Sequence, residues 1–599
     1  MKSYIVLFMV LSLCAPAFAL QDISKMSDDE FLDMVEHDSV MYYVKHVHPK
    51  SGLIAYDGVN THIGSNGFAL NAFCIGAERK YIAREEAAGL ALKMLETFRN
   101  TAANHEGAFQ WMSDAETASK GHAPSFDLVE TAYVCAGALA CKQYFNGQSE
   151  TEKKIRQYAG EIYSRVRFDK FMLDSGLKKN NTLAWSYESD KKQFSDFRIN
   201  GYNECMIVYI LALGAPKYPA SPKCWDGWAQ TYSWRNCYGN FYFFCPPMFT
   251  HQYSLCWADL RDVQDKYTKD KNITYFENSR RAAISHIAYA KENPKQFPGY
   301  GPIWGLTDCG CPLHPNGFGG HAIPDGGYVD DGTVAVSGAG ASIMFTPKES
   351  IACLRHVYEL YGDKMYDEFG FRSAFNVTTG WVDANHDMLN KGAMLTAIEN
   401  YRSGLIWAMF MKNREIQAAL RKAGFKKAAI KEKKPEKESK YETAEILEYM
   451  DVSDGWDVYC DKGASVNYGE VSGKDGNALQ VSYNFGSGGW ICFSKPLYRN
   501  LEKYEGISFD YYTEGAKNKI EVKIENEGGT VYGYVFPAGK GRAEWTTKEI
   551  PFGDMWYFWG GDGELNFSKV RISIAVSKDE GGFGKIVVDN LRAIIKAKN

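Results

Sequence analysis

Three acidic residues in the N-terminal half have the type and spacing that acid–base chemistry requires. Asp127 and Glu130 stand three residues apart near the start of a predicted helix, so both side chains share one helix face. Glu204 follows the turn at 201–203 and precedes an apolar run over 205–213. Such carboxyl groups could serve as proton donor and proton acceptor in a hydrolysis. The alternative is that they only stabilise helix N-termini through the helix dipole.

The residues after Glu204 form the most aromatic stretch of the chain. Between 225 and 257, 12 of 33 residues are Phe, Trp or Tyr, against 14% of the whole sequence. Aromatic rings stack on the apolar faces of pyranose sugars, so a carboxylate beside them indicates a sugar-cleaving cleft. A helical core rich in Trp and Tyr explains the same composition equally well.

The position of Glu204 at a predicted helix start leaves its protonation open. The helix dipole lowers the pKa of a carboxyl group in the first turn, whereas burial among Trp234, Tyr238 and their neighbours raises it. A proton donor needs the raised pKa.

The N-terminus and the charge balance indicate an exported protein with neutral partners. An apolar run over 4–13 followed by Ala-Pro-Ala-Phe-Ala at 15–19 predicts a secretory signal peptide over 1–19. Acylation at Cys14 is the weaker alternative, because Leu13 stands where a small residue is usual. No later segment has about 18 consecutive apolar residues, so no membrane span is predicted. A net charge of −5 with interspersed signs argues against nucleic acid as a partner. We expect a secreted or periplasmic monomer that binds a polysaccharide or oligosaccharide.

The number and positions of the cysteines argue against a framework of disulfide bonds. Thirteen remain after the signal peptide, an odd number, and several lie inside apolar helical patterns. We expect these to be buried free thiols: Cys74, Cys135, Cys141, Cys205 and Cys353.

The hydrophobic periodicity divides the chain into a helical and a β-rich part. Apolar residues recur at helical spacing between about 25 and 425, which predicts roughly a dozen helices. The clearest are expected near 82–98, 126–145, 152–166, 203–213, 276–290, 349–361 and 392–411. Helices joined by long loops rich in Gly, Trp and Tyr suggest paired helices in a toroid, with the cleft at one end.

The sequence changes character after residue 425. A lysine-rich segment over 426–440 predicts a solvated linker. From 441 to 599, apolar and polar residues alternate, as over 507–511, 520–524 and 570–574, which predicts an all-β sandwich of short strands.

Residues 64–425 resemble the bacterial putative glucoamylase (glycoamylase-like) family, whose better understood relatives include the endo-β-1,2-glucanases of glycoside hydrolase family 144. The matching stretches lie at 67–68, 75–79, 127–131, 201–204, 232–236, 249–254, 275–280, 331–333 and 398–402. The resemblance implies an all-α (α/α)6 toroid and an anomer-inverting hydrolase of β-linked glucan, which needs no cofactor for catalysis. By position, Asp127, Glu130 and Glu204 match acidic residues implicated in the family's activity. Because inversion needs one carboxyl group as acid and another as base, we assign Glu204 as the acid, with Asp127 or Glu130 as base or as organiser of the water; the reverse assignment is the alternative.

The same resemblance suggests which side chains contact glucose units. Candidates for ring stacking and for hydrogen bonds to hydroxyl groups are Trp111, Trp185, Trp234, Arg235, His251, Gln252, Tyr253, Trp304 and Asp331. For each of them the alternative is packing in the core or in a loop.

Two segments depart from the pattern of the family. The approach to Asp127 reads His-Ala-Pro-Ser-Phe at 122–126, where many relatives are acidic and Gly-rich. Before the last long helix the chain has Asn390, where relatives often have Asp. If that position held the catalytic base, Asn390 could not serve, and activity or specificity would differ.

Cys309, Cys311, His314 and His321 have the residue types of a zinc site, but their spacing fits no common structural pattern. The sequence therefore predicts no metal site there.

The C-terminal part resembles the jelly-roll carbohydrate-binding modules of secreted glycanases. Trp545, Trp556, Tyr557 and Trp559 line a glycan surface in this interpretation, or pack between the sheets in the alternative. A structural calcium ion at Asp589 would be compatible with such a module.

The leading hypothesis is a secreted hydrolase of β-1,2-glucan. The alternatives are an exo-acting or transglycosylating enzyme of the same fold, and a catalytically weakened glycan-binding protein.

Overall fold

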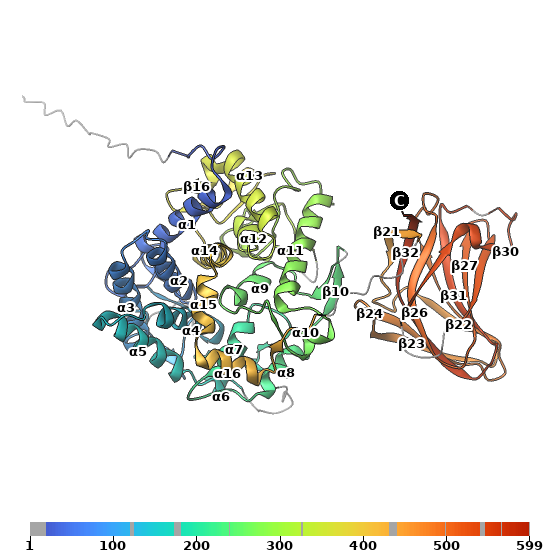
Figure 1. The fold of residues 1–599 in the computed structure, drawn as a ribbon, viewed down its shortest axis with the longest axis horizontal. Helices are drawn as coiled ribbons and strands as arrows, with labels where there is room; N and C mark the ends of the chain where they lie inside the picture. Colours follow the sequence, from blue (N-terminus) through green and yellow to red (C-terminus); the bar gives the residue numbers. More distant parts are fainter. Residues whose placement is uncertain are drawn as a thin grey trace, which may run out of the picture. The chain divides into compact units, whose positions relative to one another are not determined.

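The computed structural model describes residues 19–119, 125–172, 181–238, 240–324, 328–430, 440–497, 499–538, 545–564 and 566–597 (Figure 1). It divides into two compact units. The first comprises 1–233 and 243–430, and the second comprises 234–242 and 431–599. Residues 1–18 of the predicted signal peptide, 122–124 of the departing segment and 431–439 of the predicted linker lie outside the described residues.

The first unit is predominantly helical (Figure 1). Its helices are α1 (Asp28–Lys45), α2 (Ser65–Glu78), α3 (Arg84–Asn100), α4 (Leu128–Tyr144), α5 (Glu150–Arg165), α6 (Phe168–Phe171), α7 (Met206–Gly214), α8 (Lys223–Ala229), α9 (Phe249–Gln252), α10 (Lys266–Asp270), α11 (Tyr275–Glu292), α12 (Val336–Gly340), α13 (Pro347–Met365), α14 (Met388–Arg402), α15 (Leu405–Met411) and α16 (Arg414–Lys422), with a 3-10 turn η2 (Ser254–Cys256).

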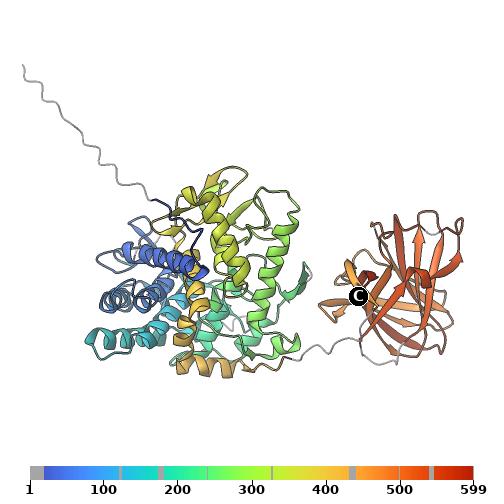
Figure 2. The same cartoon turned by 45° about the horizontal axis from the view of Figure 1, so that its top comes forward.

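These helices fall into two kinds by burial. Helices α2, α4, α7 and α14 are buried on nearly all sides, whereas α3, α5 and α13 bury only one face, as amphipathic surface helices do. The buried helices contact one another in a closed circuit from α14 through α2, α4, α7 and η2 back to α14. Helices α3 and α5 pack outside α2 and α4, and Figure 2 shows the N-terminal helices, in blue, running side by side.

Two glycines allow α2 and α4 to approach closely. A Cβ on Gly67 would lie 2.1 Å from the Tyr133 carbonyl oxygen, and a Cβ on Gly137 would lie 2.1 Å from the Gly67 carbonyl oxygen. Neither position accepts a side chain, because these distances are far shorter than van der Waals contact. The close crossing fixes the position of α4, whose first turn carries Glu130.

The predicted helices correspond to α3, α4, α5, α7, α11 and α13, with one difference beyond residue 400. The apolar run over 392–411 predicts one helix, but the structure has two, α14 and α15. The break falls at Gly404, whose φ of 73° belongs to the left-handed region. Glycine adopts that region without steric cost, so the chain turns there despite continuous apolar periodicity.

Short strands connect the helices of the first unit. They are β1 (Asn60–His62), β2 (Asn104–His105), β3 (Ala108–Gln110), β4 (Met112–Asp114), β5 (Ser125–Asp127), β6 (Leu183–Ala184), β7 (Ser186–Glu188), β8 (Gln193–Phe194), β9 (Arg198–Ile199), β12 (Val263–Gln264), β13 (Cys309–Cys311), β14 (His314–Gly319), β15 (Thr333–Ala335), β16 (Tyr366–Asp367), β17 (Gly370–Phe371), β18 (Ala374–Asn376), β19 (Trp381–Val382) and β20 (Lys426–Lys427). The sheet β2-β3-β5-β7-β8 leads directly into α4, and β20 pairs with β12, so the predicted linker begins in a strand.

The second unit contains two six-stranded antiparallel sheets, with strand orders β23-β24-β32-β26-β29, where β21 also pairs with β32, and β22-β25-β31-β27-β28-β30. The strands are β21 (Tyr441–Glu448), β22 (Asp457–Cys460), β23 (Ser465–Ser472), β24 (Asn477–Asn484), β25 (Trp490–Leu497), β26 (Gly506–Gly515), β27 (Lys519–Asn526), β28 (Val531–Pro537), β29 (Thr546–Pro551), β30 (Trp556–Trp559), β31 (Val570–Ser577) and β32 (Phe583–Lys596). Alternate residues of both sheets form one hydrophobic core, including Phe509, Val522 and Ile574. This confirms the β-rich C-terminal part. The hairpin β10 (Trp234–Cys237) and β11 (Asn240–Phe243) groups with this unit up to residue 242.

Asp589, where the sequence suggested a structural calcium ion, is buried, and its Oδ1 has no hydrogen-bond partner within the described structure. Asp589 Oδ2 accepts hydrogen bonds from the backbone N–H groups of Lys474, at 2.7 Å, and Asp475, at 3.2 Å. The neighbouring carboxylate of Asp510 is paired with Lys474 Nζ at 2.8 Å and with Arg592. The calcium ion at Asp589 therefore stays a prediction.

All five cysteines expected in the core are buried free thiols, which confirms that prediction. Within the described ranges, no helix combines the length and apolar character needed to cross a membrane.

Candidate active site

Asp127 is held at the junction of β5 and α4. It is the N-cap of α4, and its Oδ1 accepts hydrogen bonds from the backbone N–H groups of Val129 and Glu130 at 2.8 and 3.0 Å. Its Oδ2 accepts a hydrogen bond of 2.8 Å from the indole N–H of Trp185. The sequence signal of an acid before an apolar helix is therefore a genuine cap. Because the carboxylate is also buried, it is more than a surface cap.

Glu130 lies in the first turn of α4 beside a histidine that the sequence did not single out. His62, at the end of β1, places its Nδ1 3.3 Å from Glu130 Oε2. The indole N–H of Trp111 points to His62 Nε2 at 3.0 Å. Because an indole nitrogen only donates, Nε2 is the acceptor and the proton of neutral His62 is on Nδ1, facing Glu130. Burial lowers the pKa of His62, which favours this neutral form.

The carboxyl group of Glu130 packs against a glycine backbone. A Cβ on Gly64 would lie 1.9 Å from Glu130 Oε2, so any larger residue would displace the carboxyl group. Glu130 is 9% exposed, and apart from the 3.3 Å contact with His62 Nδ1 its Oε2 has no hydrogen-bond partner within the described structure. A buried acidic oxygen with one long contact can accept or donate a further hydrogen bond to a substrate or to a water molecule.

Glu204 lies in the turn before α7, which begins at Met206. The sequence placed it at the helix start itself. Its backbone carbonyl accepts a hydrogen bond of 2.5 Å from Ser254 Oγ, and Asn203 Oδ1 accepts one of 3.1 Å from the backbone N–H of Cys205. The Glu204 side chain is only half-buried, in contrast to those of Asp127 and Glu130. It therefore combines a fixed backbone with access to solvent.

Burial dominates the protonation of all three acids. It raises the pKa of Asp127 to about 7, that of Glu130 to about 8 and that of Glu204 to about 7. The negative charge of Glu130 adds to the rise at Asp127, and that of Glu204 adds to the rise at Glu130. The three carboxyl groups thus interact electrostatically. Burial raises their pKa values by more than the helix dipole and the hydrogen bonds lower them.

A fourth acid, Asp308, joins this group and was missed by the sequence reasoning. It precedes β13, its charge contributes to the raised pKa of Glu204, and burial raises its own pKa to about 6. Asp308 Oδ1 is buried without a hydrogen-bond partner in the described structure. It comes from a Gly-rich loop with no helical periodicity, so only its position in space reveals it.

Asn390 links the acid cluster to a further carboxylate. Its Nδ2 donates to the backbone carbonyl of Asp308 at 3.0 Å and to Asp387 Oδ2 at 2.7 Å, while its Oδ1 accepts from Tyr253 Oη at 2.7 Å. Asp387, also missed by sequence reasoning, is the N-cap of α14, and burial raises its pKa. An ionised aspartate at position 390 could not donate either bond. The departure at Asn390 is thus accommodated by its neighbours.

The predicted sugar-contacting residues fall into separate groups. Trp111 and Trp185 lie beside the acids, and Trp111 is 43% exposed. Tyr253 and Trp304 are buried, and their polar atoms bond to Asn390 and to the Glu349 carbonyl.

His251 and Gln252 are also buried. His251 bonds to the Cys245 carbonyl, and burial lowers its pKa to about 3, while Gln252 donates to the Gly338 carbonyl. One nitrogen of each of these two side chains, Nε2 in both cases, is thus engaged within the protein, and their contact with a sugar stays a prediction.

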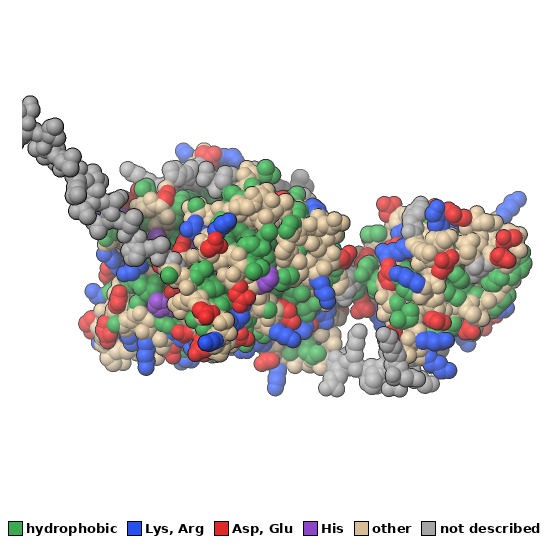
Figure 3. All heavy atoms as spheres, turned by 90° about the horizontal axis from the view of Figure 1, so that it is seen from above, with side chains coloured by type: hydrophobic (Ala, Val, Ile, Leu, Met, Phe, Trp, Pro, Cys, Tyr) green, Lys and Arg blue, Asp and Glu red, His purple; other side chains and the backbone are tan. Residues whose placement is uncertain are grey.

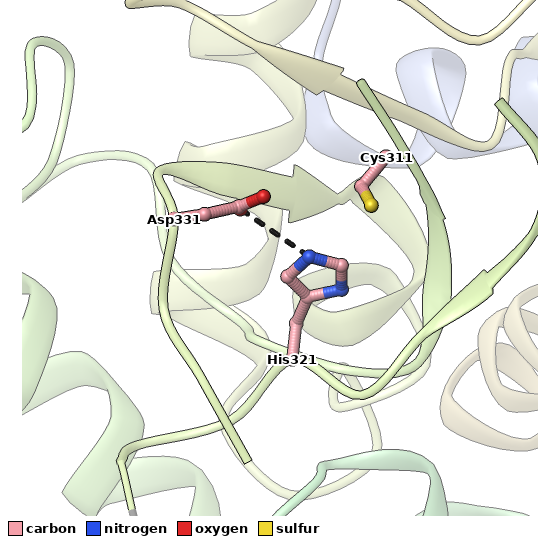
Figure 4. Close-up of side chains that lie close together, drawn as sticks. All are labelled: Cys311, His321 and Asp331. Carbon is pink, nitrogen blue, oxygen red and sulfur yellow. Dashed lines mark ion pairs between the residues drawn. The ribbon is translucent and has the colours of Figure 1, made fainter. Parts of the chain in front are cut away.

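Trp234 and Arg235 lie on β10, in the hairpin that groups with the second unit. The ring of Trp234 stacks on Phe241 of β11, with ring centroids 6.4 Å apart. Asp331 contacts His321 at 3.3 Å, and Cys311 completes a group with these two (Figure 4). The side chain of His314, the remaining candidate from the sequence, lies outside the described residues.

The surface is compatible with an uncharged ligand. On the face shown in Figure 3, acidic and basic side chains are interspersed among apolar and neutral ones. No field of a single sign is visible on that face, as expected for a protein with neutral partners.

Comparison with known proteins identifies both parts of the chain. The model of the family described as putative glucoamylase matches residues 196–414, and that of the carbohydrate binding domain (family 11) matches residues 433–596. The chain is 32% identical over 435 residues to an exo β-1,2-glucooligosaccharide sophorohydrolase (non-reducing end) of Parabacteroides distasonis, covering 66% of this chain. That match spans 58% of the length of the relative.

Solved structures that match the chain include two that each cover 67% of it. A putative glucoamylase from Bacteroides caccae is matched over its whole length with 31% identity and a TM-score of 0.61. An endo-β-1,2-glucanase from Chitinophaga pinensis, in complex with sophorotriose and glucose, is matched over 99% of its length with 28% identity and a TM-score of 0.61. The chain belongs to the putative glucoamylase family and carries a C-terminal family 11 carbohydrate binding domain.

Proposed function

We propose that the protein is a secreted, anomer-inverting glycoside hydrolase that cleaves β-1,2-glucan. The observation that supports this most strongly is the cluster of the buried acids Asp127 and Glu130 with the half-buried acids Glu204 and Asp308, in which each pKa lies near or above 6. Acids that exchange protons near neutral pH are what glycoside hydrolysis requires. The names of the two β-1,2-glucan-degrading relatives suggest the linkage.

We assign the general acid to Glu204. Its pKa of about 7 matches a group that gives up a proton near neutral pH and recovers it, and it is the most solvent-accessible of the three predicted acids. In an inverting reaction the acid protonates the departing glycosidic oxygen while a second carboxylate deprotonates the attacking water.

We assign the base to Asp127. Three N–H groups donate to its two oxygens, and such donors favour the carboxylate form. Glu130, with the highest pKa of the cluster, stays protonated at neutral pH and can donate a hydrogen bond that orients the water or a sugar hydroxyl group.

We further propose that the helical unit is an (α/α)6 toroid. The buried members α2, α4, α7, α9, α12 and α14 alternate along the chain with the outer helices α1, α3, α5, α8, α11 and α13. The closed circuit of contacts through α2, α4, α7, η2 and α14, to which α9 adds through η2 and α12 through α14, supports this arrangement. The C-terminal unit is then a jelly-roll glycan-binding module, supported by the exposed aromatic side chains of Trp556, Tyr557 and Trp559 on β30.

The function is tested by incubating the purified protein and a Glu204→Gln variant with β-1,2-, β-1,3- and β-1,4-glucans and separating the products by size. We expect the wild type to cleave β-1,2-glucan and the variant to be at least about 100-fold slower, because a general acid contributes that much. Disaccharides alone would indicate exo action like that of the Parabacteroides relative, and a ladder of oligosaccharides would indicate endo action. No cleavage of any β-glucan would refute the proposal and favour a glycan-binding protein.

A further inference from the structure

Three separate segments of the first unit bring a thiol, an imidazole and a carboxylate together. Cys311 ends β13, His321 follows β14, and Asp331 precedes β15. One ligand-type atom from each lies within 4.8 Å of the others, and Figure 4 shows the three side chains converging on one point. The proposed hydrolysis uses none of the three.

The orientation of His321 is fixed by its other ring nitrogen. Nδ1 lies 2.9 Å from the Gly319 carbonyl oxygen, which only accepts, so Nδ1 carries the proton. Nε2 then faces the Asp331 carboxylate, to which it donates a hydrogen bond when the ring is a cation; in the neutral ring its lone pair is free for a metal ion. A backbone carbonyl that holds the far side of the ring is the usual support of a metal-binding histidine.

The separation of the two facing atoms also fits a cation between them. His321 Nε2 and Asp331 Oδ1 are 3.3 Å apart. A charge-assisted hydrogen bond would bring them to about 2.7–2.9 Å. Two ligands at about 2.0–2.1 Å from a tetrahedral ion lie about 3.3–3.4 Å apart. Cys311 Sγ lies within 4.8 Å of both ligand atoms, whereas tetrahedral nitrogen and sulfur ligands lie about 3.6 Å apart, so a shift of at most about 1 Å completes the set.

Two of the three side chains are buried, and the third is partly exposed to solvent. Cys311 and His321 are 2% and 1% exposed, whereas the Asp331 side chain is 27% exposed. A backbone N–H of Thr333 donates to Asp331 Oδ1 at 2.9 Å and orients the carboxylate. An ion can therefore enter past Asp331 and be held by two buried ligands.

We propose that Cys311, His321 and Asp331 bind one zinc-type divalent cation. A thiolate and an imidazole select zinc-type ions over magnesium or calcium, and three protein ligands leave one tetrahedral position for water. Cys309 Sγ lies 3.6 Å from the opposite nitrogen, Nδ1, and is therefore outside the ligand set. The ion ties β13 to the segments at 321 and 331. Since Asp308 directly precedes β13, the ion holds that acid in the cluster without contacting the substrate.

The proposal is tested by metal analysis of the full chain. The purified protein is loaded with Zn²⁺, separated from free ion by gel filtration, and its zinc content is measured by mass spectrometry. We expect one zinc per chain in the wild type and background levels in Cys311→Ala and Asp331→Asn. Two matched controls should keep one zinc per chain. Cys309→Ala removes the buried thiol at the other end of β13, and Cys353→Ala removes a buried thiol on α13.

A second measurement uses only the wild type, in case the ligand variants fold poorly. With Co²⁺ in place of Zn²⁺, thiolate coordination produces a charge-transfer absorption band, which we expect at one equivalent of cobalt. Absence of stoichiometric zinc and of that band in the folded wild type would overturn the proposal. So would retention of zinc by folded Cys311→Ala, or its loss from Cys309→Ala. These results are independent of hydrolytic activity, so they do not depend on the proposed function.

Discussion

Replacing Glu130 with Gln should stabilise the protein increasingly as the pH rises. The pKa of Glu130 is raised from 4.5 to about 8 by burial, so the folded state holds a proton that the unfolded chain releases. Below pH 4 both states are protonated and the residue has no pH-linked effect. Between pH 4.5 and about 8, the free energy of unfolding of the wild type falls by about 1.4 kcal/mol per pH unit. From pH 4.5 to pH 7 the loss is therefore about 3 kcal/mol.

Glutamine has the shape of the protonated acid but does not ionise, so Glu130→Gln removes this loss. The assay is thermal and denaturant unfolding of the helical unit from pH 4 to 9. We expect no pH-linked advantage of the variant at pH 4 and a growing one that levels off above about pH 8. An advantage or deficit that does not change with pH would refute the reasoning.

Glu152→Gln is the matched control with the opposite sign. The hydrogen bonds and charge of Arg84 outweigh burial and hold the pKa of Glu152 below its usual value. Its stabilising contribution is present above the unfolded pKa and is lost as the pH falls through the folded one. Glu152→Gln should therefore destabilise the protein at neutral pH and have less effect near pH 3.

Three further substitutions test the site. Trp185→Phe removes the indole N–H that donates to Asp127. A hydrogen bond to a charged group is worth about 1.5–3 kcal/mol, so its loss should move the acidic limb of the kcat/KM profile up by about 1–2 pH units. An unchanged limb would exclude Asp127 as the base. Gly64→Ala should displace the Glu130 carboxyl group and lower kcat by at least about 10-fold, with far-ultraviolet circular dichroism unchanged. Wild-type kcat would contradict the contact. In Asn390→Asp the new carboxylate cannot donate to the Asp308 carbonyl or to Asp387. The free energy of unfolding should therefore fall by about 2–4 kcal/mol at pH 7. A stabilised variant would refute the linking role of Asn390.

The periodicity of the sequence predicts the architecture of the two parts well. Helices such as α3 and α5 bury one stripe, and strands such as β27 alternate, so a local pattern records which side faces the core. The turn at Gly404 was missed because apolar residues continue on both sides of it. The positive φ at Gly404 is a property of the folded backbone, and the presence of a glycine alone does not predict it.

The acid cluster was predicted only where its members share a local signal. Asp127 and Glu130 lie in one helical turn, and Glu204 lies beside an unusual aromatic run. His62, Asp308 and Asp387 come from a short strand, a loop and a distant helix cap, so no spacing in the sequence brings them together.

Of the twelve aromatic residues between 225 and 257, six are buried and six are partly exposed, so core packing accounts for half of the run. Trp225, Trp228 and Trp257 are almost fully buried, whereas the tryptophans beside the acids, Trp111 and Trp185, come from other parts of the chain. Burial also decided the protonation of the acids, which the sequence had left open between burial and the helix dipole.

The central claim, hydrolysis of β-1,2-glucan by an inverting acid cluster, is tested most directly by following the anomeric protons of the wild-type digest with time-resolved NMR. Inversion at a β-linked glucose releases a product whose new reducing end is first the α-anomer. We predict that the α-anomer signal appears first and then equilibrates with the β-anomer. Initial appearance of the β-anomer, or no new reducing ends, would contradict the account.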